Sequence, residues 1–434
     1  MKIKVGKLND EFMYLTEFNK KKYALNKVME NEIVEVDFKD NKIKNLKIVS
    51  PSPKRIKPEC PYYANCGGCS LQHLPYNFQL EQKQQIVERL FQELGLKTKV
   101  KNIKSAKQFH YRNKCQLTFG FVNKKPTSGF YKEYSHELIS VNECLIEDEL
   151  GLKIKKEVTD LINKFHYSYY NEQTSTGTIK HIMVKTTTIG EAMVIIVTND
   201  QQLKGSKAFL DAIVKRCPNV KTIIQSIHPK NNTHVLGDVN KILYGKGYIT
   251  DSLLGFKFQI SAKSFYQINR FITKDLYQEV IDCLKDDHFD TIIDAYSGTS
   301  TISVVASPYV KKVISVELEK DATKNALENI KINNVKNISV INEDATVFIN
   351  NIVRKKERID CVIMDPPRSG STESFINCLK ELKPKKIIYI SCDPHTQVND
   401  IKPLLKDYQV TLIQPFDLFP NTIHIETVVC LERK

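Results

Sequence analysis

Residues 290–300 are Asp-Thr-Ile-Ile-Asp-Ala-Tyr-Ser-Gly-Thr-Ser, an apolar run that leads into a turn of small residues. A buried strand followed by such a turn and a helix is the opening unit of a parallel α/β sheet. Gly298 has no side chain, so the backbone of this turn can approach a bound ligand closely. The stretch therefore predicts both a fold class and the edge of the sheet at which a ligand binds.

The same alternation of strand and helix continues to the end of the chain. Helical stretches, among them 321–333, separate most of the later strand-like runs. These runs are 312–317, 338–342, 359–365, 386–392 and a closing run at 425–431. The pattern predicts a doubly wound, Rossmann-like parallel sheet.

Acidic residues follow several of these strands. Ligands of open parallel sheets bind beyond the carboxyl ends of the strands, where Glu317, Asp344 and Asp365 are expected. A carboxylate after the second strand suits the hydroxyl groups of a ribose. The alternative for Asp294 and Asp344 is that each only caps a helix.

Cys392 ends the fifth strand-like run and faces the same crevice as Asp365. A cysteine just before a helix is expected to gain thiolate character from the helix N-terminus. His424 and Glu426 are two residues apart in the closing run and are expected to share one strand face, with Glu426 as a candidate base. Lone cysteines are usually packing residues, as we expect of Cys217, Cys283, Cys361, Cys378 and Cys430.

Five motifs in this order carry a family resemblance. They are Phe265-Tyr-Gln267-Ile-Asn, Asp294-Ala-Tyr-Ser-Gly, Asp365-Pro-Pro-Arg, Ser391-Cys392-Asp-Pro and His424-Ile-Glu426. From about residue 100 to its end, the chain resembles the bacterial RNA (uracil-5-)-methyltransferase family. The resemblance implies a class I methyltransferase domain that uses S-adenosyl-L-methionine as methyl donor.

The resemblance also implies roles for single residues. It makes Cys392 the nucleophile that adds to carbon 6 of uracil, which activates carbon 5, and Glu426 the base that removes the carbon 5 proton. The positions that match the family's donor site are Gln267, Tyr296, Glu317 and Asp365, and those beside the flipped target base are Phe265 and Gln267. Ser300 stands where the family usually has a second glycine, and it adds a side chain near the donor.

Asp365-Pro-Pro-Arg also resembles the Asp-Pro-Pro-Tyr loop of amino-group methyltransferases. Those enzymes stack the tyrosine on the target base and need no cysteine nucleophile. Arg368 offers no such ring, so the sequence favours the uracil-5 reaction.

A cysteine cluster lies far from these motifs in the sequence. Cys60, Cys66 and Cys69 fall within ten residues, with Cys144 as the best fourth ligand and Cys115 as its rival. Four thiolates suit zinc or an iron–sulfur cluster, and spacing alone does not choose between them. Several ribosomal-RNA members of the family resemble this pattern and carry a [4Fe–4S] cluster, which transfer-RNA members typically lack.

Composition is consistent with a nucleic-acid partner. Among 434 residues, 64 Lys and Arg exceed 50 Asp and Glu, for a formal charge of +14. Such a surplus favours a polyanion, although a general lysine bias would also produce it. Basic stretches at 54–57, 111–114 and 130–132, the last two with aromatic residues, are candidate RNA contacts, or solvated surface. The first residues lack a signal-peptide core and no run of about 18 apolar residues occurs, which predicts a cytoplasmic protein without membrane segments.

We expect three domains. Alternating residues in 1–55 predict a small β-barrel, which resembles the family's RNA-binding TRAM domain, and the basic tract 51–58 is expected to be a linker. Residues 56–265 are expected to form a central, mostly β domain with the cysteine cluster and an RNA-binding surface. A helix is predicted within it at about 75–96, and strands at 179–187, 192–198 and 221–228. Residues 266–434 are expected to be the methyltransferase domain.

The sequence thus predicts a monomeric enzyme that methylates carbon 5 of a uridine in 23S ribosomal RNA, in a single-stranded loop or flipped from a helix. Three alternatives stand beside it. They are a transfer-RNA substrate, a non-catalytic RNA-binding ribosome assembly factor, and an iron–sulfur redox enzyme. The cysteine cluster argues against the first, the pair Cys392 and Glu426 against the second, and the lack of a flavin or nicotinamide motif against the third.

Overall fold

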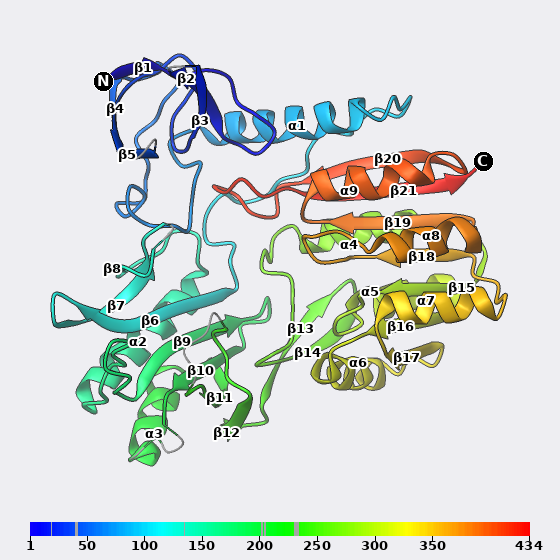
Figure 1. Ribbon diagram of the computed structural model, residues 1–434. Coiled ribbons are helices and arrows are strands. Elements are labelled where there is room, and N and C mark those ends of the chain that lie inside the picture. Colours follow the sequence, from blue (N-terminus) through cyan, green and yellow to red (C-terminus); the bar gives the residue numbers. More distant parts are fainter. Residues whose placement is uncertain (19, 40–41, 134, 201–202, 204, 230–233) are drawn as a thin grey trace.

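The computed structural model describes residues 1–434 except 19, 40–41, 134, 201–202, 204 and 230–233. Figure 1 shows three groups of elements: N-terminal strands beside helix α1 (Tyr76–Gln92), a central β-rich part, and a C-terminal sheet flanked by helices. In the described part of the chain, no helix is long and apolar enough to cross a membrane.

The C-terminal sheet has seven strands in the order β17-β16-β15-β18-β19-β21-β20. The first five pair in parallel, and β21 runs antiparallel between β19 and β20. The strands are β15 (Phe289–Ala295), β16 (Val310–Glu317), β17 (Ile338–Asn342), β18 (Cys361–Met364), β19 (Lys386–Ser391), β20 (Tyr408–Phe416) and β21 (Glu426–Arg433). The predicted parallel α/β sheet is therefore confirmed, and β20 is the one strand of it that the sequence analysis missed.

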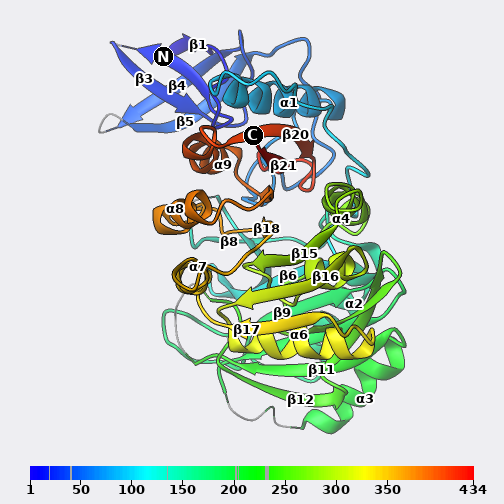
Figure 2. The ribbon, with the colours of Figure 1, turned by 90° about the vertical axis from the view of Figure 1, so that its right-hand side faces the viewer.

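Helices cover both faces of this sheet (Figure 2). One face carries α7 (Ala345–Arg354), α8 (Glu373–Leu382) and α9 (Pro394–Ile401), which share a hydrophobic core with the strands. The other carries α4 (Thr273–Asp282), α5 (Thr301–Ala306) and α6 (Lys320–Ile332), and short 3-10 turns lie at Ser307–Tyr309 and Lys402–Leu404. The central strands β18, β19 and β21 are buried on both sides, so their sequences are nearly continuous apolar runs, which is why these runs were recognisable.

The central part is built on a second seven-stranded sheet, in the order β12-β11-β10-β9-β6-β7-β8. Its strands are β6 (Lys114–Val122), β7 (Lys125–Tyr131), β8 (Leu138–Ser140), β9 (Ile179–Thr186), β10 (Ala192–Thr198), β11 (Val220–Ile227) and β12 (Val239–Gly245). The sequence analysis missed α2 (Glu149–Lys164) and α3 (Ser206–Arg216), which pack on this sheet. The hairpin β13 (Tyr248–Leu253) and β14 (Phe256–Ser261) packs against the C-terminal sheet's helices.

The N-terminal strands pack around one small core. β1 (Lys2–Lys4), β4 (Ile33–Lys39) and β5 (Lys42–Ser50) form one sheet, and β2 (Tyr14–Phe18) pairs with β3 (Lys21–Leu25). Within the described residues no ladder of hydrogen bonds joins these two sets, so the closed, TRAM-like barrel stays a prediction. In the linker, Arg55 binds the buried Glu32 through Nε–Oε1 and Nη2–Oε2 contacts of 2.6 and 2.7 Å.

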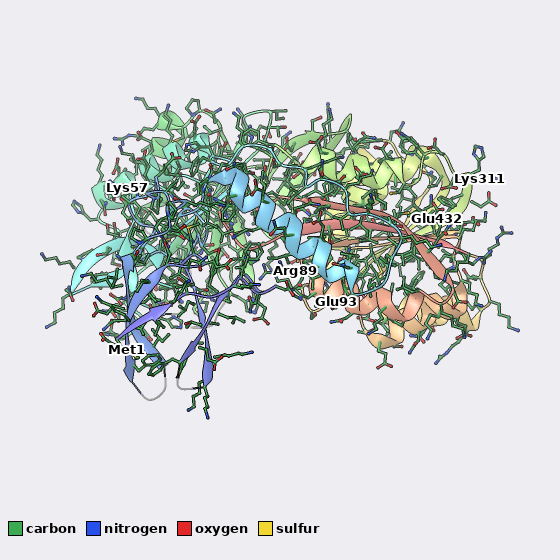
Figure 3. All side chains as sticks on the ribbon, turned by 90° about the horizontal axis from the view of Figure 1, so that it is seen from above. Met1, Lys57, Arg89, Glu93, Lys311 and Glu432 are labelled. Atoms are coloured by element: carbon green, nitrogen blue, oxygen red, sulfur yellow. The ribbon has the colours of Figure 1, made fainter. Side chains whose placement is uncertain are left out.

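Helix α1 joins two parts of the molecule. In Figure 3 it lies across the top, between the N-terminal strands and the C-terminal sheet, with Arg89 and Glu93 near its end. Arg89 pairs with Asp10 at 2.6 Å, while Ile86, Val87 and Phe91 enter the C-terminal hydrophobic core. Thus α1, which falls inside the span 56–265, packs with the C-terminal sheet.

Candidate active site

A cavity of about 850 Å³ opens beyond the carboxyl ends of β15, β16, β18 and β19. Seven of the residues predicted to form the site line it: Phe265, Gln267, Tyr296, Glu317, Asp365, Cys392 and Glu426. They come from four loops, the end of β16 and the start of β21, so the fold brings together residues spread over more than a third of the chain. Asp344 and the four cysteines of the cluster are not among the lining residues.

Cys392 lies between β19 and α9, and its thiol is the nucleophile candidate. Burial and the Glu426 carboxyl raise the pKa of the Cys392 thiol to about 11, against the lowering effect of Arg368. The expectation of thiolate character from the helix N-terminus is therefore wrong for this state, because burial and two nearby carboxyls outweigh the helix. In the free protein Cys392 is a protonated thiol at neutral pH.

Glu426 is the first residue of β21 and is fully buried against Asp365. Burial, and then Asp365, raise the pKa of Glu426 well above its ordinary value, while Arg368 lowers it. Burial and Asp294 raise the pKa of Asp365 to about 7. Such raised values are typical of functional sites. His424 precedes the strand, so the expectation that it shares a strand face with Glu426 is wrong, although both line the cavity.

The turn after β15 forms the other end of the cavity. Gly298 N–H donates to Oε2 of Glu317 at 2.8 Å, and the Tyr296 hydroxyl lies 2.9 Å from that of Ser371. Tyr296 has φ +61°, a conformation that costs energy for a residue other than glycine. The carboxylate of Glu317 is thus held at the tip of β16, where the sequence predicted it.

Ser300 does not crowd this end of the cavity. It keeps a left-handed φ of +58°, which explains why a glycine suits the position. Its buried hydroxyl lies 2.6 Å from that of Ser315 on β16, and Ser300 is not among the lining residues. The predicted side chain near the donor is therefore turned into the sheet.

Asp344 acts as the cap of α7. Its Oδ1 accepts hydrogen bonds from the backbone N–H groups of Thr346 and Val347 at 2.8 and 3.1 Å. The capping alternative raised from the sequence therefore holds. A contact between Asp344 and the methyl donor stays a prediction.

The mouth of the cavity carries an exposed aromatic ring. Phe265 is 64% exposed, although it lines the cavity, whereas Gln267 is buried. The loop before Phe265 is held by the buried Lys185, whose Nζ donates to the carbonyl oxygens of Ser261 and Ser264 at 3.0 and 2.9 Å. A large apolar side chain held in an exposed position suggests a contact surface for a ligand.

Arg368 is the functional residue whose role sequence reasoning missed. Its Nη2 lies 2.6 Å from Nδ1 of His424, and it lowers the pKa of both Cys392 and Glu426. Burial and Arg368 lower the pKa of His424 to about 4, so its ring is neutral. The signal was present in Asp365-Pro-Pro-Arg, because a cation three residues from a buried acid at a strand end suggests charge compensation.

The cysteine segment 60–71 lies beside the cavity, which Gly68 lines. Cys60, Cys66 and Cys69 influence one another electrostatically, and Cys144 lies near Cys69. Burial raises the pKa of Cys69 and of Cys144 to about 12. Cys115 is buried in the central core, so Cys144 fits better as fourth ligand.

The thiols of this segment do not form a ready metal site. Among the residues that the structure describes, no three His, Cys, Asp or Glu side chains converge closely enough to hold a metal ion. The metal cluster is therefore a proposal, and no catalytic step depends on it.

The strand order and the cavity at the carboxyl ends define a class I S-adenosylmethionine-dependent methyltransferase. A family model described as tRNA (Uracil-5-)-methyltransferase matches residues 75–434. The chain therefore belongs to the RNA (uracil-5-)-methyltransferase family, and the predicted S-adenosylmethionine-dependent enzyme class is confirmed.

Relatives extend this similarity over nearly the whole chain. The chain is 36% identical to an uncharacterized RNA methyltransferase of Bacillus cereus, over 89% of this chain and 85% of the relative. It is 35% identical to one of Clostridium tetani, over 98% and 93%. The crystal structure of Pyrococcus abyssi tRNA (uracil-54, C5)-methyltransferase with S-adenosyl-L-homocysteine has a TM-score of 0.80 at 25% identity, over 99% of both chains.

Proposed function

We propose that this enzyme methylates carbon 5 of a specific uridine in 23S ribosomal RNA, with Cys392 as nucleophile and Glu426 as base. The observation that carries the proposal is that both residues line one cavity, together with Asp365 and the exposed Phe265 ring. One chain supplies every residue of this cavity, so we expect a monomer to be active.

The residues of the cavity suit a cationic methyl donor. Glu317, Asp365 and Glu426 contribute three carboxyl groups, and buried carboxyls are stabilised by a positive ligand. S-Adenosylmethionine, when bound, supplies a methyl group on a positively charged sulfur. Glu317 and Tyr296 would hold the nucleoside part, while Asp365 and Gln267 would lie toward the reacting end.

The chemistry of the chain's own residues then follows in order. Cys392 loses its thiol proton to water, and its thiolate forms a bond to carbon 6 of uracil, which makes carbon 5 nucleophilic. Carbon 5 would then take the methyl group of the donor as the bond between that group and the donor's sulfur breaks, which leaves the donor as a neutral thioether. Glu426 then takes the proton from carbon 5, the electrons of that C–H bond restore the double bond between carbons 5 and 6, and the bond from sulfur to carbon 6 breaks. Arg368 stabilises the negative charge on sulfur at both ends of this sequence.

RNA would enter at the side of Phe265. The basic residues Arg112, Lys114 and Lys263 line the same cavity, so phosphates and a flipped base meet complementary groups there. A base stacked on Phe265 would present carbon 6 to Cys392. In the basic stretch 54–57, Arg55 is paired with Glu32, which leaves Lys54 and Lys57 as the candidate RNA contacts of that stretch.

The cysteine segment supports ribosomal RNA as the substrate. We propose that Cys60, Cys66, Cys69 and Cys144 bind a [4Fe–4S] cluster, with zinc as the alternative, as similar ribosomal-RNA members of the family do. The N–H of Gly68 already donates to Sγ of Cys66 at 3.4 Å, a bond that favours a thiolate ligand. The second candidate substrate is transfer RNA, which the family description and the Pyrococcus abyssi relative favour.

The deciding experiment is methyl transfer from labelled S-adenosylmethionine to total RNA from a strain that lacks this gene, with Cys392→Ala and Glu426→Gln beside the wild type. We expect label as 5-methyluridine in one fragment of 23S RNA. We expect no label with Cys392→Ala, and with Glu426→Gln a covalent protein–RNA adduct that survives denaturing electrophoresis. Iron, zinc and sulfide analysis of the purified protein decides the content of the cysteine site.

Label in transfer RNA would support the proposed chemistry and would show that the substrate is transfer RNA, not 23S RNA. No label anywhere, from protein that contains its cluster, would overturn the enzymatic proposal in favour of an RNA-binding assembly factor. Label that persists in Cys392→Ala would remove Cys392 from its role.

A further inference from the structure

The loop between β20 and β21, residues 417–425, carries three lining residues of the cavity: Phe419, Thr422 and His424. Glu426 follows it directly as the first residue of β21. The loop has no regular secondary structure, so the bonds that hold it come from elsewhere in the chain. The hydrogen bonds that hold this loop therefore also set the position of the base Glu426 at the start of β21.

Lys83 of helix α1 fixes both ends of the loop. Its side chain is completely buried, and its Nζ donates to Oδ1 of Asp417 at 2.6 Å and to the carbonyl oxygen of His424 at 2.9 Å. The Tyr76 hydroxyl donates to the other oxygen of Asp417 at 2.8 Å. A buried ammonium is costly unless it is paired and fully hydrogen-bonded, so the arrangement is a specific one. Figure 1 shows α1 lying along β20 and β21.

Asn421 fixes the middle of the loop. It has φ +66°, is completely buried, and its carbonyl oxygen accepts the N–H groups of Ser70 and Leu71, each at 3.0 Å. Its side chain accepts from Gln108 Nε2 at 2.7 Å and donates to the Gln108 carbonyl oxygen at 3.0 Å. Gln79 of α1 accepts the backbone N–H of Asn421 at 3.1 Å. The cysteine segment, which ends at Leu71, thus holds the loop directly.

We propose that Lys83 and Asn421 are positioning residues for Glu426, and that they set the rate at which the base removes the carbon 5 proton. This inference rests on the proposed role of Glu426. If the loop loosens, the thiolate of Cys392 still adds to carbon 6 and carbon 5 is still methylated. Proton removal then slows, and the enzyme remains bonded to the methylated base.

The test compares Lys83→Met with the wild type in single- and multiple-turnover methylation of the RNA fragment that the first experiment identifies. We expect kcat to fall roughly 10- to 100-fold, as for a misplaced catalytic group, while KM for RNA stays within about twofold. The fraction of enzyme trapped as covalent adduct on denaturing gels should rise toward that of Glu426→Gln. A purely structural defect would lower the amount of active enzyme without raising the trapped fraction.

Lys386→Met is the matched control. Lys386 lies at the opposite end of β19 from Cys392, and its Nζ also binds a carboxylate, Asp287, and a carbonyl oxygen, that of Cys283 at 2.9 Å. It should lower thermal stability without trapping adduct. If Lys83→Met is unfolded by circular dichroism, Asn421→Gly decides the matter, because glycine accepts the positive φ and removes only the side-chain bonds.

The outcomes separate the two proposals. No adduct in Glu426→Gln would overturn the role of Glu426 itself. Adduct in Glu426→Gln, but wild-type kcat and trapping in folded Lys83→Met or in Asn421→Gly, would overturn the positioning role alone.

Discussion

At the scale of single residues, the cavity places buried acids and the Cys392 thiol near the cation Arg368. Burial raises the pKa of Asp365, Glu426 and Cys392 above their ordinary values. Arg368 lowers the pKa of the two groups that must act as anions, Cys392 and Glu426. The reactive state of the site therefore depends on one guanidinium.

Replacing Arg368 by Met should move the pH dependence of the reaction upward. The pKa of Cys392, already raised to about 11, would rise further, so less thiolate would be present at any given pH. We expect the single-turnover rate at pH 8 to fall roughly tenfold for each unit by which the pKa of Cys392 rises. The rate should recover as the pH is raised. Arg368→Lys, which keeps the charge, is the control. A loss of rate that is the same at every pH would contradict this account.

Asp294 gives a prediction for stability. Among the residues that the structure describes, its Oδ1 has no hydrogen-bond partner, whereas Oδ2 accepts from Ser303 at 2.6 Å, and burial raises the pKa of Asp294 to about 7. A folded-state pKa above the unfolded value of about 4 means that this contribution to stability is present below pH 4 and is lost as the pH rises through 7. The free energy of unfolding of Asp294→Asn, relative to that of the wild type, should therefore increase between pH 5 and 7.5, by on the order of 1 kcal/mol per pH unit.

Thermal unfolding of both proteins across this pH range measures the effect. Asp290→Asn, at an exposed carboxylate on the same strand, is the control, and its difference from the wild type should stay flat. A flat difference for Asp294→Asn as well would show that the Asp294 carboxyl is not neutral in the folded protein.

At the scale of elements, α1 contributes buried residues to the core of the C-terminal sheet. Phe91 is 2% exposed and lies in the core formed with β19, β20 and β21. Phe91→Ala should lower the free energy of unfolding by about 3–5 kcal/mol, since it removes a buried aromatic ring and leaves a cavity. Urea unfolding measures this. Phe121→Ala, at a 39% exposed ring, should change it by less than about 0.5 kcal/mol.

The elements found and missed have physical reasons. The strands that are buried on both faces were predicted from their apolar runs. β20 was missed because it is an edge strand that alternates polar and apolar residues and contains Pro415, which only an edge strand tolerates. The helices α2 and α3 lie among strands, and their apolar residues recur at helical spacing in stretches that were assigned to a mostly β domain.

At the scale of the whole molecule, the sequence predicted which residues meet but not their chemical state. Motifs at strand ends placed Cys392, Glu317 and Asp365 in one crevice, because parallel strands end at one edge. The high pKa of Cys392 was not predictable, because it depends on burial by loops distant in sequence. The same holds for Lys83 and Asn421, whose partners are more than 300 residues away or in an irregular loop.

The packing of α1 also has a consequence for synthesis. The helix leaves the ribosome early, but the strands β20 and β21 that cover its apolar face are the last to be made. Until then part of this face is uncovered and Lys83 lacks Asp417, so the nascent chain exposes an apolar segment that chaperones can bind until translation is nearly complete. A chain that stops before residue 417 lacks both β21 and the partners of Lys83, and we expect proteases that recognise exposed apolar segments to degrade it.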